Sequence, residues 1–306
     1  MEQSPLFLGL DVGGTKCAAA IGTPDGNLLM RREWPSITSR GPEPMVADFV
    51  SASRDLLKEF KVTAVGVSIG GPLNAASGIV LSPPHLPGWD AFPLKERLEQ
   101  ALQLPVAVEH DAAACGLAEY TWGAFAGSKR MIYLTCGTGF GAGIILDGKA
   151  YRGANGHSVE IGHGRFAEDG PELFGKRGSI EGYCAGAGIP LLAAIKYPER
   201  WAKQPPSTAE LAALARQGDE QAIAIIECNG RSVGQVCANL ADLLFPEVIL
   251  LGSLARHLGE PWIKSVRTRF AEEAHPHAQG CRIEPASLAD RLQDLSALVV
   301  ALNAPL

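Results

Sequence analysis

The sequence predicts an α/β protein made of two related lobes that face each other across a cleft. Two segments support this prediction, residues 6–22 and residues 131–148, because each reads as a strand, a glycine-rich turn and a second strand. Two matching hairpins far apart in one chain indicate one ancestral unit used twice. The chain has 306 residues, of which 46% are hydrophobic, so it is long enough to build two lobes with their own cores.

The elements expected in the first part of the chain alternate between strands and helices. The first 35 residues favour an antiparallel meander, with a glycine turn at GGTK (13–16) and a hairpin turn at 24–27. A helix is expected from about Glu43 to Phe60, because its apolar residues fall on one stripe. The following elements are expected to be a strand at 62–69, a helix from Pro93 to Leu102, a strand at 105–110 and a helix at 111–123.

The second part of the chain is expected to follow a similar plan. After the second hairpin, the pattern predicts a long helix at 222–244, a buried strand at 247–252 and a helix at 261–274. No low-complexity segment or linker interrupts the chain, so the lobes are expected to be tightly connected. The first lobe is assigned residues 1–115, with a C-terminal helix at about 288–306 packing back on it, and the second lobe residues 116–287.

Composition and charge exclude several classes of protein. The net charge of −6 provides no basic field for nucleic acid, and no run of 18 apolar residues predicts a membrane span. The N-terminus has no basic region before its apolar stretch, so it is interpreted as a strand and not as a signal peptide. An odd number of scattered cysteines favours buried thiols in a reducing cytoplasm over a disulfide framework. They are Cys17, Cys115, Cys136, Cys184, Cys228, Cys237 and Cys281.

The two glycine-rich turns are candidate phosphate sites. A phosphate needs backbone N–H donors at close range, and glycine permits that approach. In the first turn, Asp11 is a candidate for positioning a hydrated Mg²⁺ and Lys16 for adding positive charge. Either turn alone is more simply explained as a tight hairpin, and neither is a Walker A loop or a Rossmann fingerprint, since each leads into a strand. The proposed phosphate-binding residues are Gly13, Gly14 and Thr15 in the first turn and Gly137, Thr138, Gly139 and Gly141 in the second.

The chain resembles the ROK family (repressor, open reading frame, kinase), whose sugar kinases have the actin/hexokinase-like, ribonuclease H-like fold. The resemblance covers nearly the whole chain, and six segments in the same order carry it. They read LDVGGTK, GIVLSPPHLPGW, LPVAVEHDAAACGLAE, LTCGTGFGAGII, NGHSVEIGH and FPEVILLGS. The resemblance implies two actin-like lobes, ATP with Mg²⁺ in the cleft, and a sugar beside the first lobe.

Asp111 is the expected catalytic base. It follows a strand and opens a helix, where a carboxylate is favoured by the helix N-terminus. Phosphoryl transfer to a sugar requires a group that accepts the hydroxyl proton, and a positioned aspartate can do this. An aspartate at such a place is more often a plain helix cap. The resemblance nevertheless matches Asp111 to the family's catalytic aspartate.

The expected sugar-binding residues come from three stretches of the chain. Carboxylates and imidazoles can discriminate among sugar hydroxyls through paired hydrogen bonds. Taken alone, Glu160 and Glu181 would more often be surface charges. The resemblance implies sugar contacts by Glu160, His163 and Glu181, by Gly71 and Asn74 in the SIGGPLN loop, and by His110 and Asp111.

The sequence departs from the family pattern at several positions. Many members bind zinc through a histidine and three cysteines, but Glu172, Phe174 and Ser179 stand where the cysteines would be, so no structural zinc is expected. His110 replaces the usual asparagine, which either alters the accepted hydroxyl pattern or only packs against the cleft wall. Gly70 replaces a proline, and the adenine-side turn has Gly252 followed by a serine.

The expected function is ATP-dependent phosphorylation of a hexose or N-acetylhexosamine, with glucose at its 6-hydroxyl as the first expectation. An N-acetylmannosamine kinase is the alternative, because the loop at 70–80 resembles the same stretch of those kinases. A non-catalytic sugar-binding regulator is a further alternative, suggested by His110 and the missing cysteines. A family repressor is disfavoured, since only ten residues precede Asp11. The resemblance also implies a homodimer, while the net charge and the lack of a long apolar run predict no nucleic-acid or membrane partner.

Overall fold

The computed structural model describes residues 4–304, and the chain divides into two compact units. The expected boundary at 115/116 falls inside a helix that belongs entirely to the first unit, because that helix packs against the C-terminal helix. Unit 1 runs up to Gly127 and also contains Gly143–Val159 and the residues from Ser287 onward, whereas unit 2 contains Ser128–Ala142 and Glu160–Ala286.

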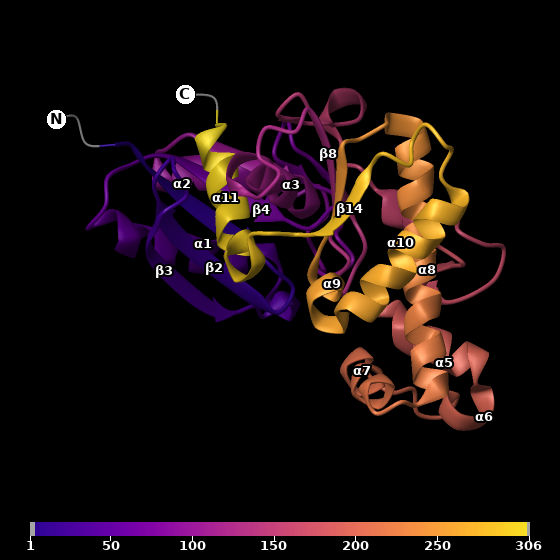
Figure 1. Cartoon of the computed structure of the whole chain (residues 1–306). Helices are drawn as coiled ribbons and strands as arrows, with labels where there is room; N and C mark the ends of the chain where they lie inside the picture. Colours follow the sequence, from indigo (N-terminus) through magenta and orange to yellow (C-terminus); the bar gives the residue numbers. More distant parts are fainter. Residues whose placement is uncertain (1–3, 305–306) are drawn as a thin grey trace. The chain divides into compact units, whose positions relative to one another are not determined.

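Unit 1 is built on a five-stranded sheet (Figure 1). Its strands are β1 (Leu6–Val12), β2 (Lys16–Gly22), β3 (Leu28–Pro35), β4 (Val62–Ile69) and β7 (Val106–His110). They lie in the order β3-β2-β1-β4-β7. The first three strands are antiparallel, so the predicted meander is confirmed, and β4 and β7 run parallel to β1. β4 is buried along most of its length, as expected for a parallel strand that is covered on both faces.

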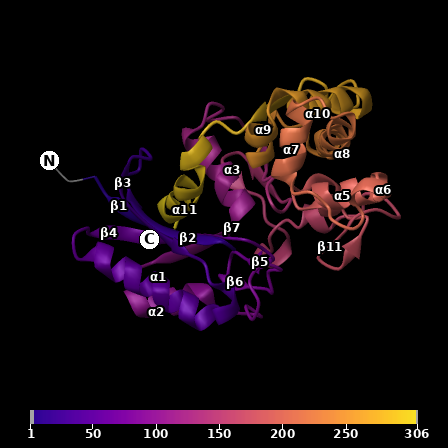
Figure 2. The same cartoon turned by 90° about the horizontal axis from the view of Figure 1, so that it is seen from below.

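Helices cover both faces of this sheet (Figure 2). On one face, α1 (Pro42–Leu57) and α2 (Leu94–Leu102) form the core with alternate strand residues such as Leu8 and Leu10. α1 ends before Phe60, which nevertheless packs against the same core and so completes the apolar stripe without being helical. The other face is covered by α3 (Asp111–Trp122) and α11 (Leu292–Leu302).

Glycine allows α11 to approach the sheet closely. A Cβ atom on Gly66 of β4 would lie 2.1 Å from the backbone nitrogen of Ala301, which no side chain could occupy. The C-terminal helix begins at Leu292 and not near 288, because Ala289–Arg291 form a 3₁₀ turn. The last two positions of the expected range, 305–306, lie outside the described residues.

Short strands complete unit 1. They are β5 (Leu73–Asn74), β6 (Ile79–Val80), β9 (Ala142–Leu146, which begins at the unit boundary) and β10 (Lys149–Ala150). A Cβ atom on Gly143 would lie 2.1 Å from the carbonyl oxygen of Ala112, so β9 passes directly against the start of α3. This close packing explains why Gly143–Val159 belongs to unit 1.

Three parallel strands form the core of unit 2. They are β8 (Arg130–Leu134), β13 (Val248–Leu251) and β14 (Arg282–Pro285), with β13 paired to both of the others. Every residue of β13 is buried, so the prediction of a buried strand at this point is confirmed.

The longest helix of unit 2 is α8 (Glu220–Leu244), which packs against α10 (Glu260–Glu273). The pair is joined by a buried hydrogen bond from Trp262 Nε1 to Asn229 Oδ1 of 2.8 Å. Both helices confirm the sequence prediction. The smaller elements are α4 (Ile180–Cys184), α5 (Gly188–Lys196), α6 (Pro198–Trp201), α7 (Thr208–Arg216), α9 (Ser253–Leu258), β11 (Glu172–Leu173) and β12 (Lys176–Arg177).

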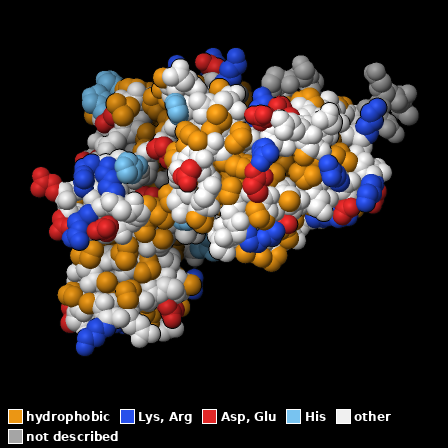
Figure 3. Space-filling model, turned by 180° about the vertical axis from the view of Figure 1, so that it is seen from behind, with side chains coloured by type: hydrophobic (Ala, Val, Ile, Leu, Met, Phe, Trp, Pro, Cys, Tyr) orange, Lys and Arg blue, Asp and Glu red, His pale blue; other side chains and the backbone are white. Residues whose placement is uncertain are grey.

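The apolar character of the helices and the distribution of surface charge agree with the amino-acid composition. Among the described residues, no helix combines the length and apolar character that crossing a membrane requires. On the face drawn in Figure 3, acidic and basic side chains are interspersed, in keeping with a net charge of −6.

Candidate active site

The first glycine turn joins β1 to β2 in unit 1. The Gly13 N–H donates to the carbonyl oxygen of Lys16 at 3.1 Å, and a Cβ atom on Gly13 would lie only 2.5 Å from that oxygen. Gly14 and Thr15 are exposed at the tip, so their backbone groups are accessible to a ligand. The Lys16 ammonium lies 2.9 Å from the Glu33 carboxylate, so an ion pair within the sheet already engages this charge.

Asp11 lies near the end of β1, just before this turn, and is partly buried. Burial, and after it the nearby charges of Asp111 and Asp294, raise the pKa of Asp11 to about 8 against the opposing effect of Arg31. The repulsion from Asp111 means that the end of β1 and the start of α3 bring two carboxylates close together. Such a pair suits a site that receives a cation.

Asp111 is the first residue of α3, immediately after β7 ends at His110. Its side chain is 46% exposed, and its Oδ1 accepts the Ala112 N–H at 2.6 Å. A Cβ atom on Gly70 would lie 3.9 Å from Asp111 Oδ2, so the loop after β4 faces this carboxylate.

His110 packs beside Asp111 and is nearly buried. Its side chain is 7% exposed, and its Nε2 lies 3.4 Å from Asp111 Oδ1. Its Nδ1 is buried and has no hydrogen-bond partner within residues 4–304. A buried nitrogen of this kind is costly unless a ligand satisfies it.

The loop from Gly71 to Asn74 lies in the same unit. It contains a cis peptide bond between Gly71 and Pro72. The Asn74 side chain donates to the Asn155 carbonyl at 2.8 Å and accepts the Ser77 N–H at 3.0 Å. Asn74, which the sequence predicts to bind sugar, therefore also joins the segment after β10 to the loop at 71–74.

The second glycine turn lies in unit 2 between Thr135 and Gly141. The Thr135 N–H donates to the Gly141 carbonyl at 3.0 Å, and the Gly141 N–H donates to Thr135 Oγ1 at 2.8 Å. Within the turn, Gly137 donates to the Gly139 carbonyl at 3.0 Å, and Thr138 is exposed at the tip. This closed turn with an exposed tip resembles the first in form.

Gly252 and Ser253 pack directly on the second turn. A Cβ atom on Gly252 would lie 1.9 Å from the Thr135 carbonyl oxygen, so only glycine fits there. Ser253 Oγ donates to the Cys136 carbonyl at 3.1 Å, which fixes the turn from the side. The serine that replaces the usual second glycine therefore has a structural role.

The predicted sugar residues of unit 2 come from one loop and α4. Glu160 and His163 are exposed at the two ends of a 3₁₀ turn (Ile161–His163), and the His163 carbonyl accepts from the Lys176 ammonium. Glu181 is the second residue of α4, and its Oε1 accepts the Phe140 N–H of the second glycine turn at 3.0 Å. A predicted sugar residue thus contacts a predicted phosphate turn.

Hydrogen bonds hold the loop that lacks the zinc cysteines. β11 and β12 form a small hairpin with Phe174 at its tip. Ser179 Oγ accepts the Gly182 N–H at 3.1 Å and so caps α4. Within residues 4–304, no three His, Cys, Asp or Glu side chains gather in a way that could hold a metal ion.

Two buried ion pairs near these residues were missed by the sequence reasoning. Asp294 of α11 is bound by Arg31 Nε at 2.7 and 2.9 Å, and Glu109 of β7 is bound by Arg152 at 2.5 and 3.0 Å. The two partners of each pair are far apart in the chain, so the spacing of residues in the sequence does not indicate that they pair. Only a glutamate at the end of an otherwise apolar strand could have drawn attention to Glu109.

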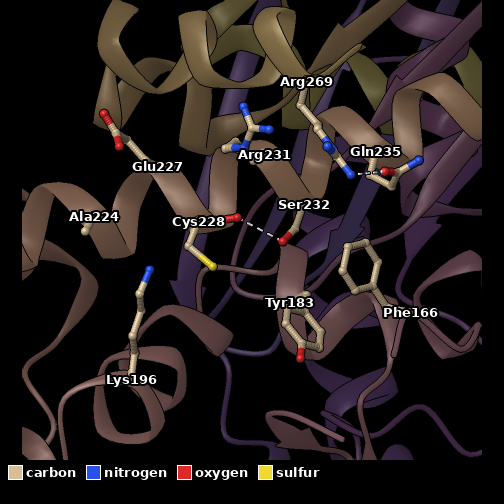
Figure 4. Close-up of a pocket in the computed structure, with 10 residues that line it drawn as sticks. All are labelled: Phe166, Tyr183, Lys196, Ala224, Glu227, Cys228, Arg231, Ser232, Gln235 and Arg269. Carbon is tan, nitrogen blue, oxygen red and sulfur yellow. Dashed lines mark hydrogen bonds between the residues drawn. The ribbon is translucent and has the colours of Figure 1, made fainter. Parts of the chain in front are cut away.

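A hollow of about 480 Å³ lies on unit 2, away from the predicted residues (Figure 4). Phe166 and Tyr183 form one wall and the exposed side of α8 another. None of the predicted site residues lines it. Its lining is Phe166, Tyr183, Lys196, Ala224, Glu227, Cys228, Arg231, Ser232, Gln235 and Arg269.

The fold is the actin/hexokinase-like fold, and the relatives and solved structures show the class of protein, an ATP-dependent sugar kinase. The chain belongs to the ROK family, whose model matches residues 7–302. The resemblance inferred from the sequence is therefore confirmed.

Relatives and solved structures agree with this assignment. The chain is 31% identical to a glucokinase of Streptomyces coelicolor, with 87% of each chain covered. It is 33% identical to an N-acetylmannosamine kinase of Escherichia coli, over 87% of this chain and 88% of that one. Its structure is similar to that of a ROK family glucokinase from Streptomyces griseus in complex with glucose and AMPPNP, with a TM-score of 0.81, 30% identity, and coverage of 98% of this chain and 100% of that one.

Proposed function

We propose that this ATP-dependent sugar kinase phosphorylates glucose at its 6-hydroxyl, with Asp111 as the general base. The observation that supports the proposal most strongly is the position of Asp111. It stands half-exposed at the N-terminus of α3, and Asp11 with the first glycine turn lies beside it in the same unit. A base and a phosphate site are thus provided by adjoining elements.

In the proposed reaction, the Asp111 carboxylate accepts the proton of the 6-hydroxyl as that oxygen attacks the γ-phosphorus of ATP. The bond from the γ-phosphorus to the bridging oxygen breaks, and ADP leaves with that electron pair. Little covalent chemistry is required of the protein, so positioning and charge stabilisation supply most of the rate. Asp111 is suited to accept a proton because its carboxylate is half-exposed at the start of α3 and is therefore accessible to a sugar hydroxyl.

Each glycine turn is assigned as a phosphate-binding element of its own unit. The Gly13 N–H closes the first turn on the Lys16 carbonyl, so the backbone N–H groups assigned to phosphate are those of Gly14 and Thr15 in unit 1 and of Thr138 and Gly139 in unit 2, at or near the turn tips. Asp11 would hold a hydrated Mg²⁺, which supplies charge neutralisation at the phosphates when bound. The raised pKa of Asp11 means that such a cation would drive release of its proton.

Each unit has its own candidate sugar-binding residues, which are His110 and the loop at 71–74 in unit 1, and Glu160, His163 and Glu181 in unit 2. His110 Nδ1 supports this assignment, because a buried nitrogen without a partner among the described residues is satisfied if a sugar hydroxyl meets it. Glucose is the first candidate, because glucokinases are among the relatives. N-acetylmannosamine is the second candidate, because a kinase for it is 33% identical to this chain.

The test is a coupled ADP-release assay with Mg-ATP against glucose, other hexoses, N-acetylhexosamines and buffer alone. We expect turnover with glucose above all others, and turnover with N-acetylmannosamine alone would select the second candidate. Asp111→Asn is expected to lower kcat by about 10²–10⁴-fold, because a general base contributes that much. The sugar KM should stay within a few-fold, since binding groups are unchanged.

A control and a refuting result complete the test. Asp25→Asn removes an exposed carboxylate in the turn between β2 and β3 and should leave kcat as in the parent. A kcat for Asp111→Asn within a few-fold of the parent would exclude Asp111 as the base. Silence with every sugar, combined with sugar binding by calorimetry, would favour a non-catalytic sugar-binding protein.

A further inference from the structure

Glu109 is a buried carboxylate one residue from the end of β7. It is only 2% exposed. Its Oε2 accepts from Arg152 Nε at 3.0 Å and from Arg152 Nη2 at 2.5 Å. Its Oε1 accepts the backbone N–H of His110 at 3.0 Å. Both oxygens are therefore engaged, one by a guanidinium and the other by the peptide that leads into Asp111.

Arg152 is itself well anchored. It lies after β10 in a segment that is bonded to the short strand β5 of the same unit. The Ala75 N–H donates to the Gly156 carbonyl at 2.8 Å, and the Ser158 N–H donates to the Leu73 carbonyl at 2.9 Å. The guanidinium thus reaches Glu109 from a fixed support, although its side chain remains 41% exposed.

We propose that Arg152 and Glu109 are positioning residues that fix the Glu109–His110 peptide, one residue before Asp111, and thereby aim the Asp111 carboxylate. This inference rests on the proposed role of Asp111. Charge-assisted hydrogen bonds are short and directional, and two donors on one oxygen prevent rotation of the carboxylate. With Glu109 fixed, its hydrogen bond orients the His110 N–H, and the backbone at this point leads directly into Asp111, the first residue of α3.

Stability alone is a poor reason for this pair. Replacing a buried ion pair by apolar residues is often neutral or stabilising, whereas removing one partner leaves an unpaired buried charge. Without Arg152, the Glu109 carboxylate loses both donors on its Oε2 and is free to rotate, which loosens its hydrogen bond with the His110 N–H. A misplacement of about 1 Å at a reacting group can cost 100-fold in rate.

The test combines kinetics with hydrogen exchange on the full chain. Arg152→Met should lower kcat about 100-fold while the sugar KM changes less than about three-fold, because the base is misplaced and the sugar contacts remain. Amide exchange of peptides covering residues 107–114 should become faster. Arg152→Lys keeps the positive charge but offers an ammonium in place of the forked guanidinium, so its kcat should be about ten-fold higher than that of Arg152→Met.

Glu109→Gln combined with Arg152→Met tests whether the two residues act as one unit. The double variant should lose no more kcat than Arg152→Met alone, since partners in one network are not additive. Arg32→Met removes an exposed ion pair to Asp55 elsewhere in unit 1 and serves as the matched control, with kcat and exchange as in the parent.

The outcomes separate this inference from the proposed function. Unchanged exchange at 107–114 in a folded Arg152→Met or Arg152→Lys protein overturns the inference, as does a kcat within three-fold of an active parent. If the parent phosphorylates no sugar, the kinase proposal falls, and exchange alone still decides the positioning role. If Arg152→Met does not fold, Arg152→Lys carries the same two readouts.

Discussion

Asp11 should make the stability of this protein fall as the pH rises. Burial is the main reason that its pKa is raised from 3.8 to about 8 in the folded chain. Between these two values the folded state holds a proton that the unfolded state has released. Because the folded state binds more protons, the free energy of unfolding decreases with pH by up to about 1.4 kcal/mol per unit. The loss begins above pH 4 and levels off above pH 8.

Asp11→Asn should remove this pH dependence. Asparagine has the same shape and no charge, so the packing at the end of β1 is kept. From pH 3.8 to pH 7 is about three units, so the variant should be more stable than the parent by up to about 4 kcal/mol at pH 7. Near pH 4 the difference should vanish, because the parent is then protonated in both states.

Urea unfolding of parent and variant at several pH values between 5 and 8 measures this difference by linear extrapolation. Asp55→Asn is the control. Hydrogen bonds and charges from Lys58 and Arg32 lower the pKa of Asp55, so it is ionised in both states across this range and its effect should be constant with pH. A difference between parent and Asp11→Asn that is equal at pH 5 and pH 8 would refute the argument from burial.

Two further predictions concern stability. Glu119 is fully buried, and its carboxylate accepts from Ser287 Oγ at 2.6 Å and from the Leu288 N–H at 2.8 Å. Glu119→Ala should therefore lower the free energy of unfolding, measured in urea, by about 2–4 kcal/mol, because both donors lose their partner. A loss of stability smaller than that of an exposed substitution would contradict this prediction. The loop at 172–179 is held by the β11–β12 pair and by the hydrogen bond of Ser179. A metal chelator should therefore leave the midpoint of thermal unfolding unchanged, and metal analysis should find less than one zinc per chain. A lower midpoint after chelation would show that the loop depends on a metal.

Strong periodicity and burial explain which elements the sequence predicted. The meander, α8 and β13 were foreseen, because their apolar patterns are long or continuous and are flanked by turn residues. The pairs β5–β6 and β11–β12 were not, because two-residue strands have no detectable period and depend on tertiary contacts. The assignment of Gly143–Val159 to unit 1 also has no sequence signal, since it follows from packing against α3.

The sequence names candidate site residues by type, but it does not predict their hydrogen-bond partners. The glycine turns and Asp111 stand at the ends of strands, where the sequence pattern itself places them. The bond from Asn74 to Asn155 and the pair of Glu109 with Arg152 join residues that are distant in sequence, with separations of 81 and 43 positions. Sequence reasoning named Asn74 as a sugar residue but could not foresee that its amide also holds a neighbouring segment.

In unit 2, the predicted sugar residue Glu181 and the segment just after α4 are hydrogen-bonded to the predicted phosphate turn. Glu181 accepts the Phe140 N–H at 3.0 Å, and the Gly137 carbonyl accepts the Gly186 N–H at 2.7 Å just after α4. A carboxylate accepts about four hydrogen bonds, so the bond to Phe140 does not prevent Glu181 from also meeting a sugar hydroxyl. A sugar that pulls on Glu181 would therefore also pull on the backbone of residues 137–141. A ligand that orders Glu181 should therefore also order the turn at 137–141, and a ligand on the turn should order Glu181, because hydrogen bonds join the two segments.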